Sequence, residues 1–317
     1  MAYQDMVLPK IDFKKYLNDL SYLEAEMLKD VGDFTDGVLE MAEHGNQLIG
    51  AYFPWSKMQH TTRIGDGKLS IWAGANGSGK SQLLGQVINH TISQGRKACI
   101  ASLEMQPKQT LYRMVCQSAT CKASKGYSLA WLKHHTGSLY IYDQLDKVDT
   151  DRILGMAHYA AHVLGCSDIV IDSLTKCGVG RDDYTKQAEC VDRLQWCAKK
   201  WNVHIHLVAH MRKPSEGSKQ DKYSIRGASE ISDLADNVYI IERNFRKEEQ
   251  VELMDSGREF NQEVVDQACC QLIVAKNRDY GEQKKFGLWF DRESGYYRES
   301  ESIRMNPLHL EVSHEHQ

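Results

Sequence analysis

Short apolar runs alternate with longer segments of helical periodicity from residue 68 onward. Several runs, such as IVI at 169–171, are continuously apolar rather than alternating, which is typical of strands buried on both faces of a parallel sheet. The predicted strands are 69–73, 98–103, 139–142, 169–172, 203–209, 238–242, 272–276 and 286–290.

The segments between these runs predict helices. Residues 186–201 place apolar side chains along one face, and residues 151–165 follow Thr150, which we expect to be the N-cap of a helix. Alternating strands and helices predict a doubly wound α/β domain with a mainly parallel sheet. In such a domain the ligand binds beyond the carboxyl ends of the strands.

Both ends of the chain differ from this central domain, which we place at 51–300. In residues 1–50, apolar side chains recur near helical spacing, and Gly32 and Gly37 interrupt the pattern. One or two amphipathic helices are expected there, forming an arm that packs either on its own domain or on a neighbouring subunit. Residues 301–317 are polar and are predicted to be a flexible tail.

Composition excludes several classes of protein. The chain of 317 residues contains 42% hydrophobic and 26% charged residues, which excludes a disordered or collagen-like protein. Nine scattered cysteines without zinc-type spacing indicate reduced thiols. With neither a long apolar run nor a secretory signal, we expect a cytoplasmic protein with no membrane span. A net charge of −4 does not exclude DNA binding, because a few cations can be concentrated in one channel.

The strongest chemical signal matches the pattern G-x-x-x-x-G-K-[ST] between a predicted strand and an apolar helix. Its residues are Gly74, Ala75, Asn76, Gly77, Ser78, Gly79, Lys80 and Ser81, followed by Gln82. Glycines let backbone N–H groups surround phosphate oxygens at the start of a helix. We expect Lys80 to reach the β- and γ-phosphates and Ser81 to bind Mg²⁺. The motif predicts binding of a nucleoside triphosphate, with ATP the expected nucleotide.

Three polar residues end predicted strands and are candidates for the chemistry of hydrolysis. Asp172 could hold Mg²⁺, and Glu104 could orient and deprotonate the attacking water. His210 could sense the γ-phosphate through a hydrogen bond. The alternative interpretations are a turn-capping aspartate, a solvated glutamate and a structural histidine.

Two groups of cations are candidates for contacts to phosphate. The loop from 212 to 226 contains five of them, Arg212, Lys213, Lys219, Lys222 and Arg226, against two acidic residues. This loop could neutralise the phosphates of single-stranded DNA, or it could be a solvated surface loop. Lys276 and Arg278, two apart at a strand end, could reach the nucleotide of the next subunit as an arginine finger does.

In this order and spacing the motifs resemble those of DnaB-like hexameric replicative helicases, closest to the branch of phage primase-helicases and mitochondrial Twinkle. The resemblance covers roughly residues 50 to 298. Besides the phosphate loop, it rests on Ser102–Met105, Thr150–Leu154, Leu164–Cys166, Ala209–Pro214, Ile225–Ser229, Ile241–Asn244 and Ala275–Arg278. It implies a RecA-like motor that hydrolyses ATP with Mg²⁺ and moves along single-stranded DNA, 5′ to 3′, as a homo-hexameric ring.

The resemblance also implies roles for individual residues in hydrolysis. Glu104 is similar to the catalytic glutamate of the family and Asp172 to its Mg²⁺-associated aspartate. His210 matches the γ-phosphate sensor, where DnaB itself has Gln. Arg278 matches the finger supplied in trans, with Lys276 beside it.

Other implied roles concern DNA and the nucleotide base. Arg226 and Gly227 match the loop that grips DNA, and Arg243 and Phe290 match the pair that sandwiches the base, although Phe290 could equally be a core residue. Two departures are visible. No primase domain precedes the motor, so a separate primase or polymerase is an expected partner, and the N-terminal arm has no obvious match to the family's linker helix.

Two other functions remain open. A RecA/RadA-type or KaiC-like ATPase would bind DNA without unwinding it. A nucleotide-gated loader or adaptor would bind nucleotide without acting as a motor.

Overall fold

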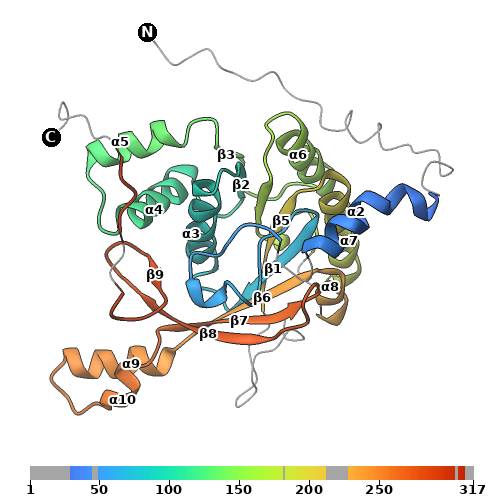
Figure 1. Ribbon diagram of the computed structural model, residues 1–317. Helices are drawn as coiled ribbons and strands as arrows, with labels where there is room; N and C mark the ends of the chain where they lie inside the picture. The colour runs from blue at the N-terminus through green and yellow to red at the C-terminus, as the bar shows by residue number, and fades with distance from the viewer. Residues whose placement is uncertain (1–28, 45–48, 181–182, 212–227, 304–305, 311–317) are drawn as a thin grey trace, which may run out of the picture.

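A nine-stranded sheet carries the fold in the computed structural model, within the residues that it describes: 29–44, 49–180, 183–211, 228–303 and 306–310. The strands lie in the order β3-β2-β4-β5-β1-β6-β7-β8-β9 (Figure 1). Neighbours from β3 to β6 in this order are parallel, and the last three strands are antiparallel. The strands are β1 (Lys68–Gly74), β2 (Ala98–Ser102), β3 (Leu139–Ile141), β4 (Asp168–Asp172), β5 (His204–His210), β6 (Asn237–Arg243), β7 (Cys270–Asn277), β8 (Lys284–Phe290) and β9 (Tyr297–Arg298).

This architecture confirms the predicted α/β fold class. All eight predicted strands are present, and each boundary lies within two residues of its expected place. The two-residue strand β9 was not predicted. The helices are α2 (Thr35–His44), α3 (Lys80–Ser93), α4 (Pro107–Ala119), α5 (Lys125–His134), α6 (Thr150–His162), α7 (Tyr184–Trp201), α8 (Ala228–Leu234), α9 (Phe245–Asp255) and α10 (Gln262–Val265), with short 3₁₀ turns η3 (Val31–Phe34), η4 (Ser56–Met58) and η5 (Leu174–Lys176).

The sheet is covered on both faces, so the protein has two apolar cores. Helices α6, α7 and α8 pack on one face, and α3, α4 and α5 pack on the other (Figure 1). Strand β1 supplies both cores: Leu69, Ile71 and Ala73 belong to the first, and Trp72 belongs to the second. This alternation follows from the two-residue period of a strand, and it explains why the run is continuously apolar.

Two local expectations were wrong. The N-cap of α6 is Asp149, whose carboxylate accepts a hydrogen bond from the backbone N–H of Arg152 at 2.9 Å. Thr150 is the first helical residue instead, and its hydroxyl donates to the carbonyl of Cys177. Gly37 does not interrupt the N-terminal pattern, because α2 continues through it.

The ends of the described chain lie on different parts of the domain. Helix α2 projects from the body, and all of its described side chains are exposed (Figure 1). Within the expected tail, Leu308 donates its N–H to the carbonyl of Ser118 at 2.9 Å and accepts a hydrogen bond from Tyr127 at 3.1 Å. Among the described helices, none has the length and apolar character needed to cross a bilayer.

Candidate nucleotide site

The phosphate loop connects the end of β1 to the start of α3, and close contacts require glycine at two of its positions. Gly79 has φ +89°, and a Cβ there would collide with the hydroxyl of Tyr297. A Cβ on Gly74 would lie 2.5 Å from the Ser78 hydroxyl oxygen and 2.7 Å from the carbonyl oxygen of Ile241. Only glycine fits these positions. Tyr297, at the far end of the chain, therefore packs directly against the loop.

Lys80 extends back along the loop. Its Nζ donates to the carbonyl oxygens of Gly74 at 3.0 Å and Ala75 at 2.8 Å. Burial lowers the pKa of Lys80, and the nearby carboxylates of Asp172 and Glu104 oppose that shift. The ammonium is thus placed within the loop at the start of a helix, where an anion is favoured.

Ser81 and Asp172 form a pair of oxygen ligands. Ser81, in the first turn of α3, donates its hydroxyl to Oδ2 of Asp172, the last residue of β4, at 2.5 Å. Burial raises the pKa of Asp172, and the hydrogen bond from Ser81 opposes this effect. Mg²⁺ prefers a few carboxylate or hydroxyl oxygens combined with substrate phosphates and water. This pair of hard oxygen donors, of which Asp172 is buried and Ser81 partly buried, lies beside the phosphate loop and fits that preference. The described residues contain no group of three or more metal-ligating side chains.

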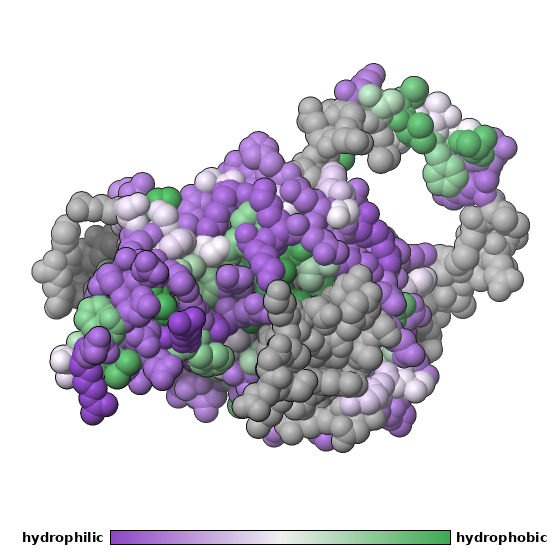
Figure 2. All heavy atoms as spheres, turned by 90° about the horizontal axis from the view of Figure 1, so that it is seen from below, coloured by the Kyte–Doolittle hydropathy of each residue, from purple (hydrophilic) through white to green (hydrophobic). Residues whose placement is uncertain are grey.

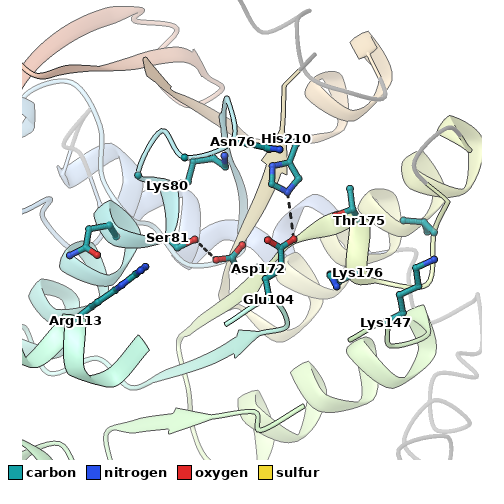
Figure 3. Close-up of a pocket in the computed structure, with 14 residues that line it drawn as sticks. Asn76, Lys80, Ser81, Glu104, Arg113, Lys147, Asp172, Thr175, Lys176 and His210 are labelled. Atoms are coloured by element: carbon teal, nitrogen blue, oxygen red, sulfur yellow. Dashed lines mark hydrogen bonds and ion pairs between the residues drawn. The ribbon is translucent and has the colours of Figure 1, made fainter. Parts of the chain in front are cut away.

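Glu104 lies beside Asp172, just after β2 (Figure 3). Its Oε1 accepts a hydrogen bond from the Ser173 hydroxyl at 2.7 Å and lies 3.6 Å from Nε2 of His210, the last residue of β5. The neighbouring His210 imidazole lowers the pKa of Glu104 to about 2, and the hydrogen bond from Ser173 contributes against the effect of burial. The carboxylate is therefore ionised and oriented toward the same space as Lys80.

These side chains surround one cavity of about 850 Å³ (Figure 3). Its lining includes four cations, of which only Lys80 was predicted; Arg113, Lys147 and Lys176 were missed. Four cations against the two carboxylates of Glu104 and Asp172 leave a formal excess of two positive charges. A cavity of this size and charge suits a polyphosphate. Lys176 could have been suspected because it follows β4 closely, whereas nothing in the local sequence distinguishes Arg113 on α4.

A second cavity of about 650 Å³ adjoins the other side of the loop, and Gly77, Gly79, Gln82 and Arg113 line both cavities. Arg243 and Phe290, predicted to contact the base, both line this second cavity. Arg243 donates to the carbonyl of Gly77 at 3.3 Å and pairs with Glu248. The ring of Phe290 lies 4.9 Å from that of Tyr297. Gln82 donates to the carbonyl of Gly295, which ties α3 to the turn before β9.

The predicted arginine finger lies elsewhere. Lys276 and Arg278 line neither cavity of this protomer. Lys276 Nζ donates to the carbonyls of Ser232 at 2.9 Å and Asp233 at 2.8 Å. Arg278 donates to the carboxylate of Asp236 at 3.1 Å and to the Asp233 carbonyl at 2.9 Å. Both cations therefore contact the C-terminal end of α8.

The predicted DNA contacts fall between β5 and α8. Residues 212–227 are outside the described part of the chain. They include all of the predicted DNA-binding residues, namely Arg212, Lys213, Lys219, Lys222, Arg226 and Gly227. The preceding strand β5 ends at His210, which lines the first cavity.

Comparisons with known proteins agree on one family. The family model for the DnaB-like helicase C-terminal domain matches residues 58–299. A DNA helicase/primase of Enterobacteria phage T3 is 24% identical over 202 residues, which cover 56% of this chain and 36% of that protein. The chain thus spans little more than a third of the length of this relative.

Solved structures show the same fold. One of them, an ATPase domain, superposes with a TM-score of 0.69 and 16% identity, covering 85% of this chain and 98% of that one. A DnaB-like replicative helicase, studied together with its interactions with primase, superposes with a TM-score of 0.66 and 15% identity, covering 85% and 67%.

Proposed function

The chain belongs to the family of DnaB-like helicase C-terminal domains, and from this premise we propose that it is a replicative helicase motor. It would hydrolyse ATP, or another nucleoside triphosphate, to move along single-stranded DNA and unwind a duplex. The main support is that Lys80, the Ser81–Asp172 pair and the Glu104–His210 pair line one cationic cavity beside the phosphate loop. A mere nucleotide-binding module would not need a glutamate so placed.

Each residue of the first cavity has a role in this proposal. Ser81 and Asp172 would hold Mg²⁺, which would neutralise charge on the β- and γ-phosphates. Lys80 binds the same phosphates, and Glu104 orients the attacking water and accepts its proton. His210 stays beside Glu104, with Nε2 3.6 Å from Oε1, until the γ-phosphate competes for the histidine. Losing that contact raises the pKa of Glu104 and makes it a better proton acceptor, so nucleotide binding and base activation are coupled.

We place the base in the second cavity, between Arg243 and Phe290. A guanidinium and an aromatic ring both stack on planar groups. Because Gly77 and Gly79 line both cavities, one nucleotide can occupy them together, with its phosphates in the first and its base in the second.

Catalysis by this motor requires a second copy of the chain. Lys276 and Arg278 line neither cavity of their own protomer, so we propose that they reach the nucleotide of a neighbour and stabilise charge in the transition state. A ring, proposed to be a hexamer, places every nucleotide at such a boundary.

Helix α2 offers a means of holding neighbouring copies together. Val31 and Phe34, in the preceding turn η3, and Val38 and Leu39, in α2, recur near helical spacing, and each of the four residues is more than half exposed. Figure 2 shows hydrophobic side chains on the segment that projects from the body. We propose that this stripe packs on an adjacent protomer, since exposed apolar side chains clustered on one short segment favour burial.

We assign contact with DNA to residues 212–227, in which Arg226 and Gly227 contact the sugar-phosphate backbone of the DNA strand. Contacts to phosphates give little sequence preference and a strong dependence on salt. Movement 5′ to 3′, a separate primase or polymerase partner, and action in the cytoplasm of a bacterial host complete the proposal; they rest on the resemblance alone.

Unwinding of a forked DNA by the full chain with ATP and Mg²⁺ tests this function. We expect strand displacement by the wild type and none by Lys80→Ala, which lacks the cation of the phosphate loop. ATP-dependent filaments on DNA without displacement would instead indicate a recombination-type ATPase.

A further inference from the structure

Helices α9 and α10 form an excursion between the neighbouring antiparallel strands β6 and β7 (Figure 1). The excursion begins at Asn244, whose side-chain oxygen accepts a hydrogen bond from the N–H of Lys247 at 3.1 Å and so caps α9. A connection of two or three residues would be enough to join such strands. The longer path therefore suggests a function.

Hydrogen bonds between its own residues hold this excursion together beside the start of β7. Lys247 is buried, although lysine is among the residues least often buried, and its Nζ donates to the carbonyl of Gln267 at 2.5 Å. The Asn244 amide donates to the Ala268 carbonyl at 3.1 Å, and Gln250 accepts from the N–H of Asn261 at 2.8 Å. Helix α9 is thus held in place at its start and along its length.

One face of α9 lines the second cavity. Three residues of α9 line this cavity together with Gly77 and Gly79: Lys247, Glu248 and Val251. Residues 247 and 251 are four positions apart, and 248 and 251 are three apart, so all three lie on one side of the helix. The Glu248 carboxylate pairs with Nε of Arg243, while Nη1 of Arg243 donates to the Gly77 carbonyl. Arg243 therefore bridges α9 and the phosphate loop.

We propose that α9 is the outer wall of the base pocket and that Glu248 is a positioning residue, which fixes the Arg243 guanidinium beside the base. The inference rests on the proposed function, in which Arg243 contacts the base. Without Glu248 the guanidinium keeps its 3.3 Å hydrogen bond to the Gly77 carbonyl and its place 5.5 Å from the centre of the Phe245 ring, but it loses its charged partner, so the nucleotide would have to order it further on binding. Glu248 thus favours binding of a nucleotide over binding of a bare polyphosphate.

The test compares two ligands on the full chain. Dissociation constants are measured with Mg²⁺ for a non-hydrolysable ATP analogue and for inorganic tripolyphosphate, which lacks the base. The variants are Glu248→Ala, Glu248→Gln, and Glu249→Gln as the control, because Glu249 is exposed and does not line the cavity. Side chains of the Arg243–Glu248 pair are 44% and 28% exposed, so the expected effect is modest, about threefold to fivefold.

We expect Glu248→Ala to weaken binding of the ATP analogue by this factor without changing binding of tripolyphosphate. Glu248→Gln keeps an oxygen acceptor and should lie between Glu248→Ala and the wild type, and Glu249→Gln should match the wild type. Equal weakening of both ligands would mean that Glu248 only supports the fold, and unchanged affinity for both would also overturn the inference. In those cases, continued ATP hydrolysis by the wild type leaves the proposed function intact, whereas a wild type that does not hydrolyse ATP contradicts the function itself.

Discussion

Gln86 on α3 holds the C-terminal strand β9 against the helix that follows the phosphate loop. Its side chain accepts from the N–H of Tyr297 at 2.8 Å and donates to the Tyr297 carbonyl at 2.9 Å, and the residue is buried. Gln94, the C-cap of the same helix, makes the same two hydrogen bonds to Tyr52, at 2.8 and 3.0 Å, but is exposed. Gln94 also donates to the His90 carbonyl at 3.0 Å, so it makes more hydrogen bonds than Gln86 and differs from it chiefly in being exposed.

Replacing each glutamine by the similarly sized methionine removes its hydrogen bonds without leaving a large cavity. Two hydrogen bonds contribute about 2 kcal/mol, and an orphaned buried N–H costs roughly a further 1–3 kcal/mol. The Tyr297 carbonyl keeps one partner, Trp55 Nε1 at 2.8 Å. We expect Gln86→Met to lower the free energy of unfolding by about 3–5 kcal/mol, and Gln94→Met by less than about 1 kcal/mol because water replaces the lost bonds.

Urea unfolding of the two variants, followed by tryptophan fluorescence and analysed with a common slope, measures both losses. Because Tyr297 packs against Gly79, Gln86→Met should also weaken binding of the ATP analogue, whereas Gln94→Met should not. Equal loss of stability in both variants would refute the reasoning, since burial would then not determine the cost.

Three further outcomes are expected. Glu104→Gln should lower turnover by orders of magnitude in an ATPase assay while nucleotide still binds, and near-normal turnover would point to a loader or adaptor. His210→Ala removes the largest cause of the lowered pKa of Glu104, so the acid limb of the kcat/KM–pH profile, which reports the enzyme without nucleotide, should move up toward the ordinary carboxyl range because the base works only when ionised. An unmoved limb counts against the His210–Glu104 contact. Arg226→Ala should weaken binding to all DNA sequences alike in fluorescence anisotropy without changing basal hydrolysis, and a collapse of hydrolysis would assign Arg226 to the nucleotide site.

The edge of the sheet that carries the chemistry could be predicted from the sequence. Glu104, Asp172 and His210 each end or follow an apolar run, and parallel strands present their carboxyl ends at one edge. Their strands β2, β4 and β5 are indeed neighbours. The phosphate loop also has its signal in consecutive residues, so no tertiary information is needed to find it.

Other parts of the site depend on contacts between distant segments. Arg113 reaches both cavities only because α4 packs beside α3, and an isolated arginine in a helix carries no signal of this. Tyr297 lies in a two-residue strand, too short for periodicity to reveal, yet it packs against Gly79. Glu248 belongs to a largely polar helix, which the sequence alone would assign to solvent.

The central claim is that the nucleotide is hydrolysed between two copies of the chain, and mixing two inactive variants tests it most directly. Lys80→Ala keeps the finger but loses the phosphate loop cation, and Arg278→Ala keeps the loop but loses the finger. In rings assembled from equal amounts, about one interface in four would pair an intact loop with an intact finger. DNA-stimulated ATPase activity of the mixture should therefore exceed the sum of the two variants measured alone. A mixture no more active than that sum would contradict the account.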